Sequence, residues 1–535
     1  MTTASIFRRA STVAALAAAA LAATACGSDF LVEDPPDIIV ADNLYTDPAG
    51  FEAGLNALYA EVRREREGRS GNNELSAEPW VIGVDNGWGN FISTSERVFT
   101  EWGANTHSQQ DVFYDTWTWM YQTINAANTI INRAANPDIA WTPEERDRVI
   151  GEARLFRAWA YRILTYMWGP VPLVLEESNG TTIRTDWERA PVADVRAQME
   201  EDLLFAEAHL PEVTTDASRL SKAVAQHYLA ELYLAMDRPA EAQAKAEAVI
   251  NSGKYQLITE RYGVQATQPG VPFMDQFLDG NVNRDEGNTE ALWVLQWEQN
   301  VAGGGSNIMR RYWTNRYYNI RGLAVSAENG GRGIGRLAPT QWALDLYEPG
   351  DDRGSAFAIR KYYIYNAATI PSGHERGDTL WLTSHPEEAS DETFPTTRKW
   401  EWVDPLNVSG DPQYNDQPYI RLAETYLLLA EAQFRQNDLA GAAATLNVVR
   451  RRAHASEIDA GDVTLAFILD ERSRELLTEE QRRFTLLRTH TWYDRTRAFN
   501  GRSGALITPR DTIFPIPQAV IDANIGAPMP QNPGY

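Results

Sequence analysis

The chain has 535 residues, of which 43% are hydrophobic and 10% aromatic, and its formal net charge is −24. This size and composition predict a globular protein with two or three lobes, and the acidic balance argues against nucleic-acid binding, which selects for basic patches. Cys26 is the single cysteine, so a disulfide framework and a cysteine-ligated metal site are both excluded. No HExxH, phosphate-loop or GxSxG motif is present, so no metal or cofactor is predicted.

Residues 1–25 are predicted to be a signal peptide. Two arginines precede an alanine-rich apolar run that is too short to span a bilayer comfortably. Cys26 follows this run, as in a bacterial lipobox, in which the cysteine becomes the N-terminal residue and carries a lipid. Ala23 stands where a lipobox usually has leucine, so ordinary cleavage that leaves a free or discarded cysteine is the alternative. We expect lipidation at Cys26, with residues 26–46 as a lipidated tether.

Residues 47–255 are predicted to form an N-terminal helical region. Thr142, a good cap followed by acidic residues, begins a long helix up to Trp168 that is apolar most of the way round and therefore belongs in the interior. Pro170 ends that helix, because proline cannot continue it. The other expected features are a helix from an Asp47 cap to about Arg66, helices at 113–135 and 191–209, and a loop-rich insertion at 68–107.

An internal repeat occurs at a spacing of 200 residues. Residues 228–250 read YLAELYLAMDRPAEAQAKAEAVI, and residues 428–450 read LLAEAQFRQNDLAGAAATLNVVR. Each copy predicts a helix, a short polar turn and a second helix, with small residues where the pair crosses. Such pairs are typical of tetratricopeptide-type helical hairpins. The alternative is a chance match of two alanine-rich segments, but the shared turn position argues against it.

Residues 256–416, between the two copies, are rich in Gly, Asn, Trp and Tyr. One strand is expected, at residues 291–297, and the rest is predicted to be irregular. Helical scaffolds often present functional residues on inserted loops. We therefore place ligand recognition in this lobe and in the 68–107 insertion.

Several separated sequence blocks resemble one known family, and they occur in the order that the family has them. They are GEARLFRAWAYRILTYMWGPVPLV (151–174), YIRLAETYLLLAEA (419–432), LNVVRRRA (446–453), ILDERSRELLTEEQRRFTLLR (468–488), FPIP (514–517) and QNPGY (531–535). The chain resembles the SusD/RagB family of outer-membrane nutrient-binding lipoproteins. It departs from the usual pattern at Thr485-Leu486, where an aspartate normally precedes the last leucine. Glu152 and Arg157 of the first block are predicted to make structural pairs.

The resemblance implies a mostly α fold, a tetratricopeptide-like scaffold with an irregular, partly β insertion lobe, and residues 417–535 as its C-terminal helical region. It also implies a non-catalytic, lipid-anchored protein on the outer face of the outer membrane. Such a protein captures an oligosaccharide or, less often, a peptide, and acts as the lid of a SusC-like TonB-dependent transporter. The helical side would then dock on the transporter barrel.

Candidate ligand-binding residues come from aromatic and polar positions in the two loop-rich segments. Tryptophan and tyrosine rings stack on the apolar faces of sugars, and arginine and asparagine bond the hydroxyls. For each residue taken singly, core packing or a partner contact is the competing and favoured interpretation, and the family varies most in these loops. The candidates are Trp80, Trp88, Asn90, Tyr312, Trp313, Arg316 and Tyr317.

Two other functions remain open at the level of sequence. A carbohydrate-active hydrolase would need two carboxylates at a defined separation, and Asp351-Asp352 or Glu387-Glu388 could be imagined in that role. A tetratricopeptide adaptor would bind a protein tail in a helical groove. A further group of charged residues is predicted to form interhelical ion pairs rather than a catalytic site: Glu471, Arg472, Glu475, Arg482 and Arg483.

Overall fold

The computed structural model describes residues 41–69, 74–90, 94–180, 182–214, 216, 218–383 and 385–535. Its contacts divide the chain into two units, Met1–Thr46 and Asp47–Tyr535. The described part of the first unit holds the short helix α2 (Ala41–Leu44). The predicted signal peptide and Cys26 lie outside the described residues. Among the helices that the structure describes, none is long and apolar enough to cross a membrane.

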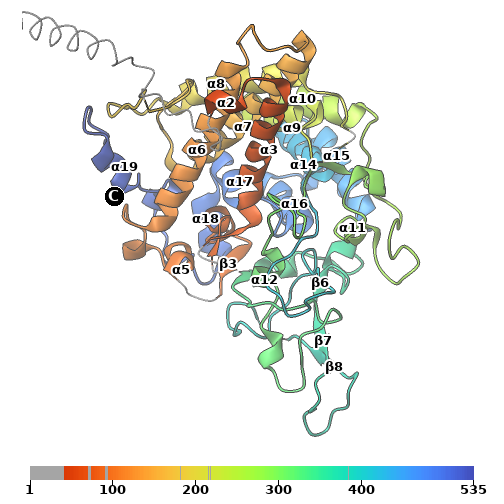
Figure 1. The fold of residues 1–535 in the computed structure, drawn as a ribbon. Helices are drawn as coiled ribbons and strands as arrows, with labels where there is room; N and C mark the ends of the chain where they lie inside the picture. The colour runs from red at the N-terminus through yellow and green to blue at the C-terminus, as the bar shows by residue number, and fades with distance from the viewer. Residues whose placement is uncertain are drawn as a thin grey trace, which may run out of the picture. The chain divides into compact units, whose positions relative to one another are not determined.

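The Asp47–Tyr535 unit is mostly helical, and its short strands pair two by two (Figure 1). The helices are α3 (Pro48–Arg63), α4 (Glu78–Val81), α5 (Thr94–Thr100), α6 (Asp111–Arg133), α7 (Pro143–Trp168), α8 (Val192–His209), α9 (Lys222–Ala235), α10 (Pro239–Asn251), α11 (Pro272–Asp275), α12 (Met309–Trp313), α13 (Gln341–Asp345), α14 (Leu422–Arg435), α15 (Leu439–Arg452), α16 (Leu465–Leu476), α17 (Arg482–Arg488), α18 (Trp492–Phe499) and α19 (Gln518–Ala523). The antiparallel strand pairs are β1 (Gly68–Arg69) with β2 (Glu74–Leu75), β3 (Gly87–Gly89) with β5 (Leu337–Pro339), β4 (Ala291–Leu295) with β10 (Gln417–Arg421), β6 (Ile359–Arg360) with β9 (Thr396–Thr397), and β7 (Tyr362–Ile364) with β8 (Thr379–Trp381).

The predicted helix starts are confirmed by their capping bonds. The backbone N–H of Gly50 donates to the Asp47 carboxylate at 3.0 Å, which satisfies one of the free donors at the start of α3. Thr142 and Glu145 form a reciprocal capping box at α7, with bonds of 3.2 and 2.8 Å. The first helix is shorter than predicted, because Arg64–Arg66 tighten into a 3₁₀ turn.

Helix α7 is the centre of the helical part and packs against α6 and α8. Its Arg157 makes two bonds, of 2.7 and 2.8 Å, to the buried carboxylate of Asp202 on α8. Its Glu152 accepts a bond from the Tyr59 hydroxyl at 2.5 Å. Both residues are therefore structural, as predicted. The indole N–H of Trp168 donates to the Pro515 carbonyl at 2.8 Å, which ties the C-terminal segment to the end of α7.

The two repeat copies form equivalent helical hairpins, α9–α10 and α14–α15. Asp237 and Asn437 occupy the same turn position with φ of 56° and 62°. The residue after each turn donates its N–H to the carbonyl five residues earlier, at 2.8 Å in the first copy and 2.9 Å in the second. Helices α10 and α14 are in contact, so the two hairpins stack. The predicted tetratricopeptide-like scaffold is confirmed.

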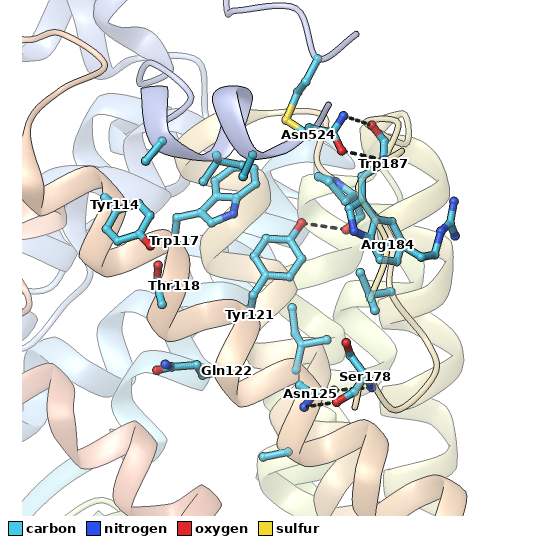
Figure 2. A pocket seen from close by; sticks show the side chains of 18 residues that line it. Tyr114, Trp117, Thr118, Tyr121, Gln122, Asn125, Ser178, Arg184, Trp187 and Asn524 are labelled. Atoms are coloured by element: carbon cyan, nitrogen blue, oxygen red, sulfur yellow. Dashed lines mark hydrogen bonds between the residues drawn. The ribbon is translucent and has the colours of Figure 1, made fainter. Parts of the chain in front are cut away.

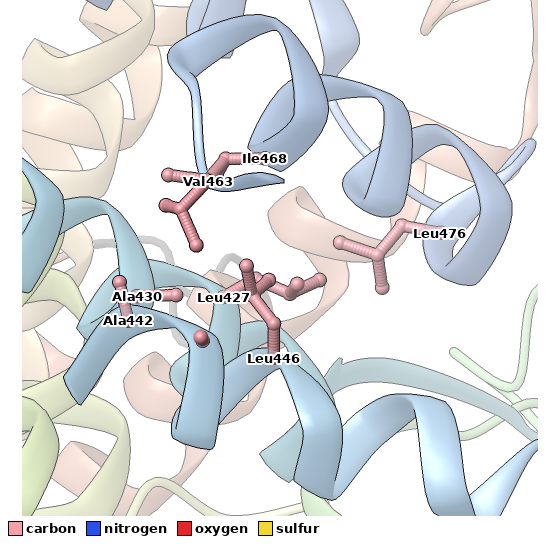
Figure 3. Packing of buried hydrophobic residues seen from close by; sticks show 8 residues of the cluster. Leu427, Ala430, Ala442, Leu446, Val463, Ile468 and Leu476 are labelled. Atoms are coloured by element: carbon pink, nitrogen blue, oxygen red, sulfur yellow. The ribbon is translucent and has the colours of Figure 1, made fainter. Parts of the chain in front are cut away.

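The second hairpin packs on α16 through an apolar cluster (Figure 3). Small residues, Ala430 and Ala442, lie where α14 and α15 cross, and Leu427 and Leu446 fill the space beside them. All four side chains are fully buried. Close approach of the helices therefore depends on the alanines, as the sequence pattern indicated.

The lobe of residues 256–416 is joined to the helices through the β4–β10 pair. Strand β4 lies where the predicted 291–297 strand was expected, though it ends two residues earlier, at Leu295. Leu295 pairs with Gln417 at the point where the chain leaves the lobe again. Figure 1 shows β6, β7 and β8 on the side of this unit away from α8 and α10. The predicted segments 47–255, 256–416 and 417–535 all lie within this one unit.

Buried ion pairs hold the C-terminal helices, and one of them, between Arg353 and Glu471, joins these helices to the lobe. Glu471 accepts from Arg353 at 2.8 Å, Glu475 from Arg421 at 3.0 Å, Arg472 donates to Glu480 at 2.6 Å and Arg482 to Asp85 at 2.8 Å. The prediction of structural ion pairs is confirmed for these four charged residues. For Arg483 it is wrong: in the described chain it has no ion pair.

The Arg483 guanidinium instead stacks on the rings of Phe514 and Trp492, at 4.2 and 4.3 Å. Burial lowers the pKa of Arg483 to about 9. Aromatic faces and two backbone carbonyls, those of Asp511 and Thr512, take the place of a carboxylate.

Candidate functional site

The two segments in which recognition was predicted meet in space. Strand β3 of the first insertion pairs with β5 of the lobe, and Trp88 lies opposite Ala338. Just beyond this pair, Asn90 donates its backbone N–H to Arg336 at 2.6 Å and its side-chain amide to Gly335 at 3.1 Å. The sequence analysis placed recognition in both segments, but it held no local signal that they would pair.

The predicted aromatic residues themselves are buried. Trp80, Trp88, Tyr312 and Tyr317 have no exposed surface, and Trp313 is 2% exposed. The half-buried Arg316 pairs with Asp391 at 3.3 Å, and Asn90 is also half-buried. In this structure the five aromatic side chains therefore offer no free face to a ligand, which favours the packing interpretation. Their role as ligand contacts stays a prediction.

A cavity of about 900 Å³ opens within the lobe, and every residue that lines it falls between Val271 and Pro395. We call it the lobe cavity. Exposed aromatic side chains form one part of its wall. Trp381 is 60% exposed and Phe357 is 40% exposed, although large apolar side chains usually avoid water. The short β7–β8 pair positions Trp381, whose ring meets Tyr362 edge to face at 5.2 Å.

Polar side chains form another part of the wall. The Thr340 hydroxyl caps helix α13 and thereby places Gln341 and Asp345 at the cavity. The Gln341 amide donates to the Asp345 carboxylate at 2.7 Å. Lys361 and Thr383 also line the cavity. These groups offer donors and acceptors beside the aromatic faces.

The remaining carboxylates of the cavity have basic side chains as partners. The buried Asp351 accepts from the Arg353 guanidinium at 2.8 and 2.9 Å, one bond on each oxygen. Asp352 contacts the His454 ring nitrogen at 2.8 Å, and Glu348 pairs with Arg450 at 3.3 Å. Burial raises the pKa of the Tyr347 hydroxyl beside them, which donates to a backbone carbonyl at 3.1 Å. Among the described residues that line the cavity, Asp345 is thus the exposed carboxylate that forms no ion pair.

Two of the predicted aromatic residues support the walls from behind. The Trp88 indole donates to Pro339 at 3.3 Å, directly before the start of α13. The Tyr317 ring stacks on Tyr363 of β7 at 4.4 Å, beneath the strand pair that carries Trp381. Sequence reasoning missed Trp381, Phe357, Gln341, Asp345 and Lys361. The strand pattern around Trp381 is too short to have shown which aromatic side chain faces outward.

The chemistry that this cavity offers is binding by stacking and hydrogen bonding. Exposed aromatic rings fit the apolar faces of flat, polyhydroxylated molecules, while amide, carboxylate and ammonium groups fit their hydroxyls. In the described part of the chain no group of three or more His, Cys, Asp or Glu side chains is placed to hold a metal ion.

Comparisons with known proteins agree on one family. Family models described as "Starch-binding associating with outer membrane" and "SusD family" match residues 30–234 and 289–535. The SusD-like protein P25 of Formosa agariphila is 24% identical, over 93% of this chain and 94% of that protein.

Solved structures show the same fold. A laminarin-binding SusD-like protein superposes with a TM-score of 0.67, at 22% identity over 91% of this chain and 99% of that one. Surface glycan-binding protein A from Bacteroides thetaiotaomicron superposes with a TM-score of 0.71, at 18% identity over 92% and 100%. Since the two family models match in order and between them take in most of the sequence, and since the fold is shared, this chain belongs to the SusD/RagB family.

Proposed function

We propose that the protein is a non-catalytic, surface-exposed binding protein for oligosaccharides. Membership of the SusD/RagB family supports this proposal, and so do the names of its relatives, which bind starch, laminarin or other glycans. The observation that carries it is the lobe cavity, whose lining combines the exposed Trp381 with amide, carboxylate and ammonium groups.

Binding in this cavity follows from its geometry. A sugar ring stacks its C–H face on Trp381, and Phe357 covers a neighbouring part of the saccharide. The Asp345 carboxylate accepts bonds from sugar hydroxyls, and these charge-assisted bonds are stronger than neutral ones. The Gln341 amide and Lys361 complete the set of partners. The Asp351 carboxylate takes no part, because Arg353 occupies both its oxygens.

No bond of the ligand is broken in this mechanism. A glycosidase needs one carboxyl group free to donate a proton and a second that acts on the opposite face of the sugar. In the lobe cavity Asp351 and Asp352 are both engaged with basic groups. This supports the proposal of a binding protein over that of a hydrolase.

The proposal includes a partner and a location. The protein would be anchored in the outer membrane by a lipid on Cys26, face outward, and close over a SusC-like TonB-dependent transporter that supplies the energy for uptake. The family description "associating with outer membrane" and the sequence of residues 1–46 support this arrangement. In this arrangement the binding protein is the lid and the transporter barrel is the pore. Release of the ligand then requires only that the two move together.

Calorimetric titration of the protein beginning at Gly27 tests the binding function. The probes are laminarihexaose, maltoheptaose, cellohexaose, xylohexaose and mannohexaose. We expect at least one to bind, and Trp381→Ala to weaken binding at the lobe cavity at least tenfold, about 1.4 kcal/mol, because the stacking face is lost. Trp402→Ala is the matched control, since Trp402 is a half-buried tryptophan of the same lobe outside this cavity.

New reducing ends are assayed in the same samples. Saccharide binding without new ends is the expected result. Formation of new ends would contradict the non-catalytic proposal. Equal affinity in the Trp381→Ala and Trp402→Ala variants would show that the lobe cavity is not the site.

A further inference from the structure

A second pocket lies on the helical side of the protein, outside both segments in which recognition was predicted (Figure 2). It has a volume of about 590 Å³ and is bounded by α6, by the segment that follows α7 and by α19. We call it the α6 pocket. Its size is within the range of sites that bind small ligands.

Aromatic side chains line the α6 pocket along one helix face. Tyr114, Trp117 and Tyr121 follow one another at spacings of three and four residues on α6, so they share a face. The Trp117 and Tyr121 rings are 5.1 Å apart, and Tyr114 is 45% exposed. Trp187 stands on the facing segment and carries the Arg184 guanidinium 4.3 Å above its ring. A ligand in the pocket thus meets aromatic faces from two elements (Figure 2).

Polar groups without partners lie on the same helix face. Within the described chain the hydroxyls of Tyr114 and Thr118 and the amide of Gln122 make no hydrogen bond. All three side chains line the pocket (Figure 2). Together they offer donors and acceptors next to the aromatic rings. A wholly apolar ligand would cover these groups without pairing them, which costs binding energy.

The walls are fixed before any ligand arrives. The Tyr121 hydroxyl donates to the Pro172 carbonyl at 2.8 Å. Asn125 and Ser178 exchange two bonds of 3.2 and 2.7 Å, from side-chain amide to backbone carbonyl and from backbone N–H to side-chain oxygen. Asn524, next to α19, bonds both the N–H and the carbonyl of Trp187, at 2.8 and 2.9 Å. A preformed site loses little conformational entropy on binding.

The pocket is electrically neutral. None of its lining residues is an aspartate or glutamate, and its single charged lining group, Arg184, pairs with Asp186 at 2.9 Å. The lobe cavity, in contrast, holds several carboxylates. Stacking faces beside neutral donors and acceptors suit an uncharged molecule that has both an apolar face and hydroxyl groups, which is the chemistry of a neutral pyranose.

We propose that the α6 pocket is a second saccharide-binding site, which holds a neutral oligosaccharide segment independently of the lobe cavity. The class of ligand rests on the proposed function, but the site does not share a residue with the lobe cavity. Two separate sites on one protein let it hold two saccharide chains, or two stretches of one long polysaccharide, and so raise the effective affinity for polymers.

The test uses calorimetry on the Trp381→Ala protein, so that the lobe cavity is weakened and the remaining site is measured alone. The probes are the five neutral oligosaccharides named above. Trp187→Ala removes a stacking face. Ala523→Trp fills the pocket from an exposed position. Tyr493→Ala is the control, a half-buried surface tyrosine on α18 outside both sites. Thermal unfolding checks that each variant is folded.

We expect the wild type to bind two saccharide molecules and the Trp381→Ala protein one. Adding Trp187→Ala or Ala523→Trp should weaken that remaining binding at least tenfold, and Tyr493→Ala should not change it. Unchanged binding in both pocket variants, or no binding by the Trp381→Ala protein, would overturn the second site. If instead Trp381→Ala has no effect while the pocket variants do, the lobe-cavity proposal fails and the second site stands.

Discussion

At the scale of single residues, Glu471 shows how charge is buried in this fold. Its side chain has no exposed surface and accepts bonds from three guanidinium groups, those of Arg353, Arg450 and Arg474, at 2.7 to 2.8 Å. Burial alone would raise the pKa of this carboxyl, but the three cations outweigh burial and lower it to about 2. Glu471 thus stabilises the folded state only while its carboxyl group is ionised.

The sign of the pH dependence follows from this shift. The pKa in the folded protein lies below the ordinary value of 4.5, so the contribution of Glu471 is fully present above pH 4.5 and is lost as the pH falls toward 2. We expect Glu471→Gln to lower the free energy of unfolding at pH 7 by about 3 to 5 kcal/mol, because three buried cations each lose one charged partner. The variant should also lose less stability than the wild type between pH 5 and pH 3.

Urea unfolding at both pH values measures this effect. Glu457→Gln is the control, since Glu457 and its partner Arg451 are each 54% exposed, and an exposed pair contributes little. A Glu471→Gln protein as stable as the control at pH 7 would show that the surrounding arginines find other partners.

At the scale of elements, the repeated hairpins depend on small residues where helices cross. Ala442 is fully buried between α14 and α15, and its equivalent in the first copy, Ala242, is 1% exposed. Ala440, two residues earlier in the same helix, is exposed. One arginine also connects the buried glutamates of the two copies: Arg488 lies 3.5 Å from Glu231 and 2.6 Å from Glu431.

We expect Ala442→Leu to destabilise the protein by about 1 to 3 kcal/mol, because extra methyl groups force the two helices apart in a filled core. Ala440→Leu, the same change on the solvent side of α15, should leave the midpoint of urea unfolding nearly unchanged. Similar midpoints for the two variants would mean that the α14–α15 crossing has free space.

At the scale of the whole molecule, the lobe and the helices are joined by the β4–β10 pair and by buried ion pairs next to these two strands. Arg421, the last residue of β10, bonds Glu475 of α16 at 3.0 Å and Glu290, beside β4, at 2.5 Å. The lobe cavity is therefore carried on a rigid connection, although its own walls are loops and short strands.

The proposed membrane attachment is also tested on the whole protein. We expect Cys26→Ser to move most of the protein out of the outer-membrane fraction, because acyl chains supply the anchoring energy, about 0.8 kcal/mol per buried methylene group. Ser28→Ala, which keeps the cysteine, should stay with the membrane. Retention of the Cys26→Ser protein in the membrane fraction would assign anchoring to a protein partner. Immunoblotting of separated membrane fractions measures the distribution.

The sequence alone was enough to predict the local features of this protein. Helix starts at Asp47 and Thr142 were predictable because a cap acts within one turn, and the repeat because small residues and turn positions recur at a fixed spacing. The family could be recognised because its motifs mark helices that pack in the core, such as α7. The structural roles of Glu152, Arg157 and Glu471 followed from the same helical context.

Only the tertiary structure decided which aromatic side chains are free. Trp88 and Trp381 both lie in short strands of loop-rich sequence, yet Trp88 is fully buried and Trp381 is 60% exposed. The difference arises because β3 pairs with β5, far along the chain, and Arg502 covers the Trp88 ring at 4.0 Å, while β8 pairs with the nearby β7. Burial depends on such distant contacts, and no local pattern in the sequence records them.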